Sequence, residues 1–133
     1  MDWMLDTNIC SYVIKRRSEL VLRRFHQHDH STISISAITS YELYAGCERS
    51  PNRERLFEKV NEFLRPFPIL PFEDKDSRQA ALIRAVLERA GTPISACDIL
   101  LAAHAMNHNL TLVTNNTREF KRVKGLKLAD WSV

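Results

Sequence analysis

Four short motifs that carry carboxylate, amide or hydroxyl groups stand at wide intervals along this chain of 133 residues. They contain Asp6, Glu42, Asp98 and the segment from Thr114 to Glu119, and three of them end an apolar run. Carboxylates that a fold brings together repel one another unless a cation joins them. If the three motif acids meet, we expect a site for a hard cation, Mg²⁺ or Mn²⁺.

Such a site favours phosphodiester hydrolysis. Mg²⁺ takes oxygen ligands and keeps several waters, and a bound ion lowers the pKa of such a water and neutralises charge on a phosphate. In this scheme Asp6 is the central ligand, flanked by Glu42 and Asp98. Asn116 is neutral, so we expect it to bind a metal-bound water or a phosphate oxygen and to add no charge.

Each acid also has a structural explanation when it is taken alone. Asp6 is suited to an Asx turn or to capping the helix that is expected to start at Ile9. Ser95 and Asp98 have the spacing of a capping box. Glu42 is harder to explain in this way, because it lies in a semi-apolar helix and a buried Glu is rare unless it is paired. The simplest interpretation of Glu119 is a surface charge on a loop.

The histidines do not form a convincing metal motif. Three of them alternate within His26–His30 and would share one face of a strand, but a solvated loop is the simpler expectation. His104 and His108 are four residues apart on a predicted helix, yet Ala105 stands where the metalloprotease pattern requires Glu. We expect this pair at the edge of the core or at the surface.

Composition sets broader limits. The net charge of +3 permits nucleic-acid binding without requiring it, and the basic group from Arg118 to Lys127 directly follows the fourth motif, where it could contact phosphates. Three glycines leave no room for a Gly-rich phosphate loop. The three cysteines form no Cys-x-x-Cys pair, so we expect buried free thiols and a reducing cytoplasm. We expect no signal peptide and no membrane span.

Hydrophobic periodicity predicts alternating strands and helices. The expected strands cover 3–5, 32–36, 69–70, 110–114 and 123–128. The expected helices cover 9–15, 19–27, 37–48 (capped by Ser36, or from 40 if Thr39 is the cap), 53–64, 76–90 (or from 74) and 96–108. Residues 115–120 are expected to form a loop. The alternation predicts a single α/β domain over residues 1–133 with a mainly parallel sheet. Ligands of such sheets bind beyond the carboxyl ends of the strands, where all four motifs are expected to lie.

The ordered set of motifs resembles that of the PIN-domain ribonucleases, and in particular the VapC toxins of bacterial VapBC toxin–antitoxin pairs. The likeness covers essentially the whole chain. The motifs that carry it are Met4-Leu5-Asp6-Thr7-Asn8, Tyr41-Glu42-Leu43, Pro93-Ile94 through Asp98, Val113 through Phe120, and the terminal Asp130-Trp131-Ser132.

The resemblance implies a three-layer α/β/α fold and a Mg²⁺- or Mn²⁺-dependent endoribonuclease that cuts structured RNA such as tRNA and arrests translation. It also implies a cytoplasmic homodimer that a VapB-type antitoxin holds inactive.

The resemblance assigns Asp6, Glu42 and Asp98 as the catalytic and metal-binding acids. It gives a further set of residues supporting or substrate-binding roles: Thr7, Asn8, Thr114, Asn116, Arg118 and Glu119. Many relatives carry a fourth acid where this chain has Asn116, and Glu119 is the nearest acid to that position.

Two other functions fit parts of the pattern. The neutral Asn116 leaves room for a catalytically weakened module that binds RNA or protein. A phosphatase with Asp6 as nucleophile is a further alternative, although Asn8 stands where the common phosphatase pattern has a second Asp.

Overall fold

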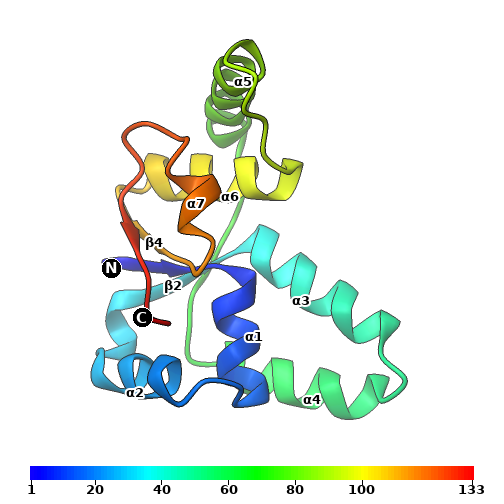
Figure 1. Ribbon diagram of the computed structural model, residues 1–133. Helices are drawn as coiled ribbons and strands as arrows, with labels where there is room; N and C mark the ends of the chain where they lie inside the picture. Colours follow the sequence, from blue (N-terminus) through cyan, green and yellow to red (C-terminus); the bar gives the residue numbers. More distant parts are fainter.

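A five-stranded parallel sheet forms the centre of the molecule in the computed structural model, which describes residues 1–133 (Figure 1). The strand order is β3-β2-β1-β4-β5. The strands are β1 (Trp3–Leu5), β2 (Ile33–Ser36), β3 (Ile69–Leu70), β4 (Thr111–Val113) and β5 (Leu128–Ala129). The sheet is therefore parallel and α/β in class, as the alternating pattern predicts.

Helices cover both faces of this sheet. They are α1 (Thr7–Lys15), α2 (Glu19–Gln27), α3 (Ala37–Arg49), α4 (Arg53–Leu64), α5 (Asp74–Arg89), α6 (Ala96–Asn107) and the short α7 (Thr117–Phe120), with a 3₁₀ turn, η1, at His30–Thr32. Figure 1 shows α1, α2 and α4 below the sheet, and α5, α6 and α7 above it. The result is the three-layer α/β/α arrangement expected from the family resemblance.

Two apolar cores separate the layers because successive side chains of a strand point to opposite faces. Leu5 belongs to the core between the sheet and α1 to α4. Its neighbour Met4 belongs to the core between the sheet and α5 and α6. The same alternation sorts β2. Ile33 and Ile35 enter the first core, while the buried Ser36 turns to the α6 face.

The carboxyl ends of the strands gather the polar motifs at one edge of the sheet. Asp6 follows β1 directly, Ser36 ends β2 and Thr114 follows β4. Because β1 pairs in parallel with both β2 and β4, these ends lie side by side. Helices α1 and α3 start from this edge, so their first turns, with Thr7 on α1, border the same space.

Most predicted elements are confirmed, and the bounds of α2 and α4 match in full. Two predictions near the C-terminus were wrong. The expected loop at residues 115–120 contains α7, because Phe120 is buried against the second core and closes a helical turn. The expected last strand at 123–128 starts only at Leu128, because Arg122 to Gly125 form turns.

The histidines of 26–30 do not form a simple solvated loop. His26 is exposed at the end of α2, but His28 stacks on Trp131 with ring centroids 4.3 Å apart. His30 packs on Phe25 at 4.6 Å. Arg24 also donates to the carbonyl of Asp130 at 3.0 Å, so this segment holds the C-terminal end of the chain against α2.

All three cysteines are free thiols; Cys10 and Cys47 are buried, whereas Cys97 is only partly buried.

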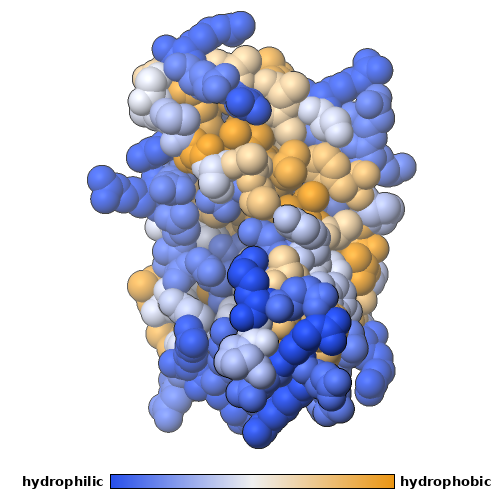
Figure 2. Space-filling model, turned by 90° about the vertical axis from the view of Figure 1, so that its right-hand side faces the viewer, coloured by the Kyte–Doolittle hydropathy of each residue, from blue (hydrophilic) through white to orange (hydrophobic).

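None of the helices combines the length and the apolar character that crossing a bilayer requires. Figure 2 shows a face whose upper part, at the level of α5 and α6, is the more apolar, and whose lower part is mostly hydrophilic.

Candidate active site

Asp6, Glu42, Asp98 and Glu119 border the carboxyl ends of the strands, called the acidic edge below. Asp6 directly follows β1 and has only 4% of its surface exposed. It caps α1, since its Oδ1 accepts the Ile9 N–H at 2.8 Å, and it also accepts a hydrogen bond from the Thr114 hydroxyl. Burial nevertheless raises its pKa from 3.8 to about 6, and the charges of Asp98 and Glu42 add to the rise. The capping role and the place among the other acids therefore coexist in one side chain.

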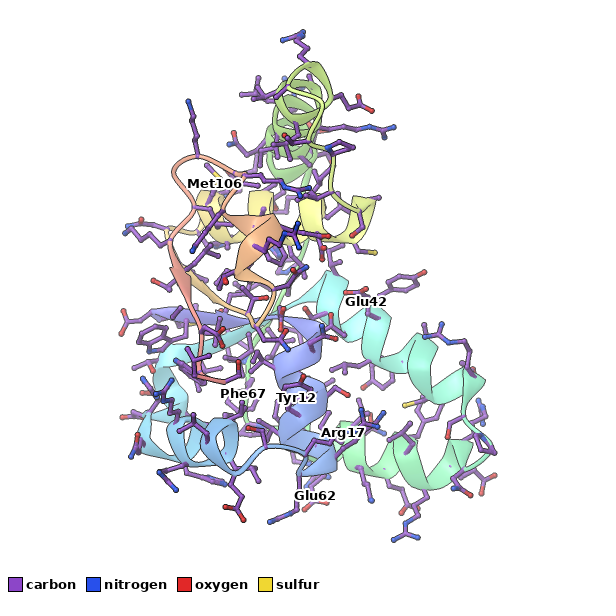
Figure 3. The ribbon with its side chains drawn as sticks, in the orientation of Figure 1. Tyr12, Arg17, Glu42, Glu62, Phe67 and Met106 are labelled. Carbon is purple, nitrogen blue, oxygen red and sulfur yellow. The ribbon has the colours of Figure 1, made fainter.

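Glu42 reaches the same edge from the second turn of α3. Its Oε1 accepts a hydrogen bond of 2.5 Å from the Thr7 hydroxyl, and Figure 3 shows it beside the start of α1. Glu42 is partly buried, and its charge acts on both Asp6 and Asp98. Thr7 thus orients one carboxylate toward the others across 35 residues of sequence.

Asp98 enters from the first turn of α6. Ser95 caps this helix, because its Oγ accepts the Asp98 N–H at 3.3 Å. Burial raises the pKa of the Asp98 carboxyl, a hydrogen bond with Ser95 opposes this, and the charges of Glu119 and Glu42 raise it further. The acids of four distant segments therefore act on one another through space.

Glu119, rather than Asn116, brings the fourth negative charge to the group. Its Oε2 accepts a 3.2 Å hydrogen bond from the Asn116 side-chain amide, and its charge acts on Asp98. Asn116 is itself anchored, since its N–H donates to the Thr114 Oγ1 at 2.9 Å. The amide therefore orients the glutamate, and α7 supplies the acid from a helical turn in place of the expected surface loop.

The remaining predicted residues lie at the rim. Asn8 is exposed and lines a groove of about 200 Å³ between α1, α3 and α4, together with Thr7 and Glu42. Arg118 is exposed on α7 and makes no hydrogen bond or ion pair within the chain. Its guanidinium therefore remains free for an external group.

The acidic group fits a hard divalent cation. None of the ion pairs of the chain involves Asp6, Glu42 or Asp98, so these carboxylates have no cationic side chain paired with them. The donors are carboxylate and hydroxyl oxygens, which suit Mg²⁺ or Mn²⁺. No three of the carboxylates bring their oxygens within 4.8 Å of one another. This spacing suits an ion that keeps several of its waters.

Comparisons with known proteins agree with this arrangement. Residues 3–126 match the PIN domain family. The chain belongs to the PIN domain family, in its VapC branch.

Two curated VapC relatives match along nearly their whole length. The chain is 39% identical over 132 residues to the "tRNA(fMet)-specific endonuclease VapC" of Shigella flexneri, with 99% of each covered. It is 42% identical over 131 residues to "Ribonuclease VapC2" of Haemophilus influenzae, with 98% of each covered. The structure aligns with the DNA-bound VapBC of Salmonella typhimurium with a TM-score of 0.92 and 38% identity, over 98% of each chain.

A second polar cluster, formed by Asp76, His104 and His108, was not predicted from the sequence. Asp76, His104 and His108 place one ligand atom each within 4.8 Å of one another, and Asp76 and His104 have no exposed surface. The expectation that His104 lies at the core edge or surface was therefore wrong. An aspartate in the first turn of α5, facing a histidine pair spaced by four on α6, was the available pattern.

The cluster does not present the lone pairs that a metal requires. The His104 Nε2 lies 3.1 Å from the carbonyl of Pro71, which only accepts, so this nitrogen carries the proton. The other ring nitrogen faces the Ser36 hydroxyl. His104 is therefore occupied on both sides by hydrogen bonds.

Proposed function

We propose that this VapC-branch PIN domain is a Mg²⁺- or Mn²⁺-dependent endoribonuclease, the toxin of a toxin–antitoxin pair. The observation that carries the proposal is the convergence of Asp6, Glu42 and Asp98 at one edge of the sheet without a compensating cation. A bound ion supplies the missing charge, activates water and stabilises the phosphate as negative charge develops on it.

Each residue of the site has a role that follows from its position. Asp6, which is almost fully buried, and the partly buried Asp98 hold the ion, with Glu42 oriented toward it by Thr7. Glu119, fixed by Asn116, adds the fourth charge beside Asp98. Thr114 restrains Asp6 through its hydroxyl.

The rim is suited to the RNA backbone. Arg118 is exposed and uncommitted on the same short helix as Glu119, and Lys121 and Lys124 follow it at the surface. Cationic side chains bind phosphates and position them without reading the bases. Asn8, at the mouth of the groove beside Glu42, adds an amide for the substrate.

The substrate that we propose is a structured RNA of the tRNA class, so that cleavage arrests translation in the cytoplasm. A relative from Shigella flexneri carries tRNA(fMet) specificity in its name, and its likeness extends over 99% of both chains. The partner that we propose is a VapB-type antitoxin, since similar structures from Salmonella typhimurium and Rickettsia felis are VapBC complexes.

We also propose a homodimer. Leu82 and Val86 on α5 are 58% and 50% exposed, and they border an apolar groove of about 460 Å³ that continues to Met106 and Val123. Exposed apolar surface of this kind commonly marks an interface. Light scattering of the wild-type chain and of a Leu82→Glu variant measures whether this face pairs two copies.

The decisive test uses purified protein and tRNA, with end-labelled products. We expect cleavage in Mn²⁺ or Mg²⁺, none in EDTA, and a loss of about a hundredfold or more in Asp6→Asn, because the central ligand loses its charge. A Ser31→Ala variant serves as the control, because Ser31 precedes β2 and so lies at the opposite end of this strand from the acids. Binding of RNA without cleavage by the wild-type chain would instead identify a non-catalytic module, and a trapped aspartyl-phosphate on Asp6 would identify a phosphatase.

A further inference from the structure

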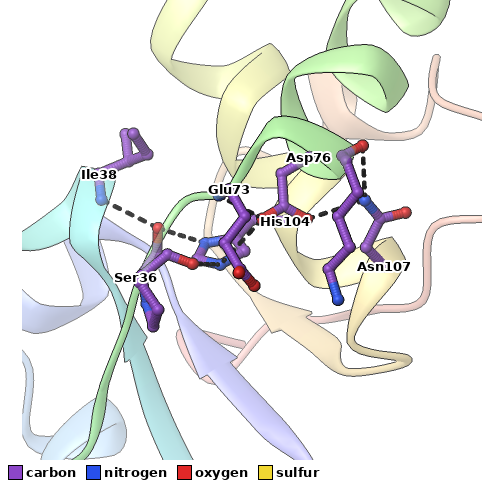
Figure 4. A network of polar contacts seen from close by, with 8 residues as sticks. Ser36, Ile38, Glu73, Asp76, His104 and Asn107 are labelled. Carbon is purple, nitrogen blue, oxygen red and sulfur yellow. Dashed lines mark hydrogen bonds and ion pairs between the residues drawn. The ribbon is translucent and has the colours of Figure 1, made fainter.

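A buried hydrogen-bond network joins the sheet edge to the helices that carry the acids (Figure 4). Ser36, at the end of β2, accepts the Ile38 N–H at 3.0 Å and so caps α3. The same Ser36 oxygen lies 2.8 Å from the Nδ1 of His104 on α6. Both side chains are fully buried, so their polar atoms depend on each other in the absence of water.

The partners of His104 fix its protonation. The Pro71 carbonyl requires the proton on Nε2, so Nδ1 is bare and accepts from the Ser36 hydroxyl. Burial lowers the pKa of the ring and so favours its neutral form, and the charge of Asp76 only partly opposes this effect. Ser36 then uses its hydroxyl fully: it accepts from Ile38 and donates to His104.

The position of this bond relates it to the acidic site. Ser36 caps the helix that presents Glu42 six residues later, and His104 lies six residues after Asp98 on its own helix. The Ser36–His104 bond links the start of α3 to α6, and a second link joins the Cys97 thiol at the start of α6 to Glu42 on α3. The buried Ser36–His104 bond therefore ties the capped end of one acid-bearing helix to the last turn of the other.

We propose that His104 is a positioning residue for the nuclease reaction, acting through Ser36 on the separation between Glu42 and Asp98. The inference rests on the proposed ribonuclease function and adds a residue that contacts neither metal nor RNA. Reacting groups must be held within about 0.5 Å, and a displacement of about 1 Å can lower a rate by about a hundredfold.

A matched pair of substitutions separates the two sides of the ring. His104→Asn places an amide oxygen near the position of Nδ1, so it can still accept from Ser36 while losing the contact with Pro71. His104→Gln places an amide nitrogen near Nε2, so it keeps the Pro71 side and loses Ser36. Both variants remove one buried hydrogen bond, so a purely structural role predicts similar losses of thermal stability and of activity.

We expect His104→Gln to lower kcat by about tenfold and to weaken Mn²⁺ binding, with KM for RNA unchanged, while His104→Asn stays within about threefold of wild type. Equal losses in both variants, or losses in neither, overturn the proposal. The wild-type chain and Asp6→Asn are assayed in parallel. If the wild type does not cleave, the proposed function has failed; if it cleaves and the pair behaves alike, only the positioning role has.

A second pair covers the case in which substitutions at His104 prevent folding. Ser36→Gly removes the hydroxyl that His104 needs, and glycine is tolerated at an N-cap. Ser18→Gly removes the equivalent cap hydroxyl from α2, which bears none of the site acids. We expect the tenfold loss of kcat only in Ser36→Gly; equal kcat in the two glycine variants also overturns the proposal.

Discussion

Two aspartates of this domain are almost completely buried, yet their environments act in opposite directions. Asp6, in the acidic edge, is 4% exposed, and its pKa rises to about 6. Asp76, beside His104, is fully buried, and its pKa is lowered. Hydrogen-bond donors and histidines surround Asp76, whereas two further acids stand near Asp6, so these neighbours favour the charged form of Asp76 more than that of Asp6.

The hydrogen-bond partners explain the contrast. Burial raises the pKa of Asp76 as well, but the Glu73 N–H at 2.9 Å and the Asn107 amide at 2.8 Å outweigh it, with help from His104 and His108. Asp6 has Ile9 and Thr114 as donors, but its charged neighbours are acids. Asp76 is therefore matched by donors within the chain, whereas the charged neighbours of Asp6 add to its negative charge.

The same substitution at Asp6 and at Asp76 should have opposite effects on stability. Asp6→Asn keeps the cap of α1 and removes a charge that costs up to about 3 kcal/mol at pH 7, given a pKa rise from 3.8 to about 6. Asp76→Asn places an amide against two donors and should cost about 1–3 kcal/mol. Urea unfolding of the metal-free variants at pH 7 should therefore give shifts of opposite sign.

The pH dependence provides the control for this pair. A carboxyl with a raised folded-state pKa lowers the free energy of unfolding as pH rises from about 4 to 6, so the advantage of Asp6→Asn should disappear below pH 4. An advantage that persists there would show that the gain comes from packing.

Metal should stabilise only one of the two regions. At a hundred times its dissociation constant, Mn²⁺ should raise the free energy of unfolding by about 2.7 kcal/mol. We expect this gain to vanish in Asp98→Asn and to remain in His108→Ala, which lies in the other cluster. Thermal unfolding with and without Mn²⁺ measures both; a gain lost in His108→Ala would place the ion beside Asp76.

Protons should compete with the metal at the acidic edge. Because the metal-free Asp6 has a pKa of about 6, Mn²⁺ affinity and RNA cleavage should fall as pH drops below 6, by about tenfold per unit for one proton. A pH series of Mn²⁺ titrations from 5 to 8 measures this. A flat profile across pH 6 would indicate that Asp6 is not a ligand.

The smallest effect is expected at the fourth charge. Glu119→Gln removes a charge that raises the pKa of Asp98, so that pKa should move downward, and Mn²⁺ should bind about twofold to fivefold more weakly. Asn116→Ala should give a smaller change, since the glutamate is retained. NMR titration of the Asp98 carboxyl follows the first effect directly, and an unchanged Asp98 would remove Glu119 from the group.

The sequence pattern was informative wherever a local rule governs the structure. Alternation in β2 and amphipathic periodicity in α4 fixed those elements, because each follows from which side chains face a core. The helical turn of α7 was missed, because its formation depends on burying Phe120 against distant residues. The burial of His104 was missed for the same reason, since its partners are 33 and 68 residues away.

By itself, the sequence determined the alternating α/β order, the oxygen-rich chemistry of the motifs and the branch of the PIN family to which they point. Only the tertiary structure decided which groups meet. It brought Glu119 near Asp98 and Ser36 against His104, and it placed the acids Glu42 and Asp98 near Asp6. The physical reason is that local patterns are set by neighbours along the chain, whereas the energy of a buried charge is set by neighbours in space.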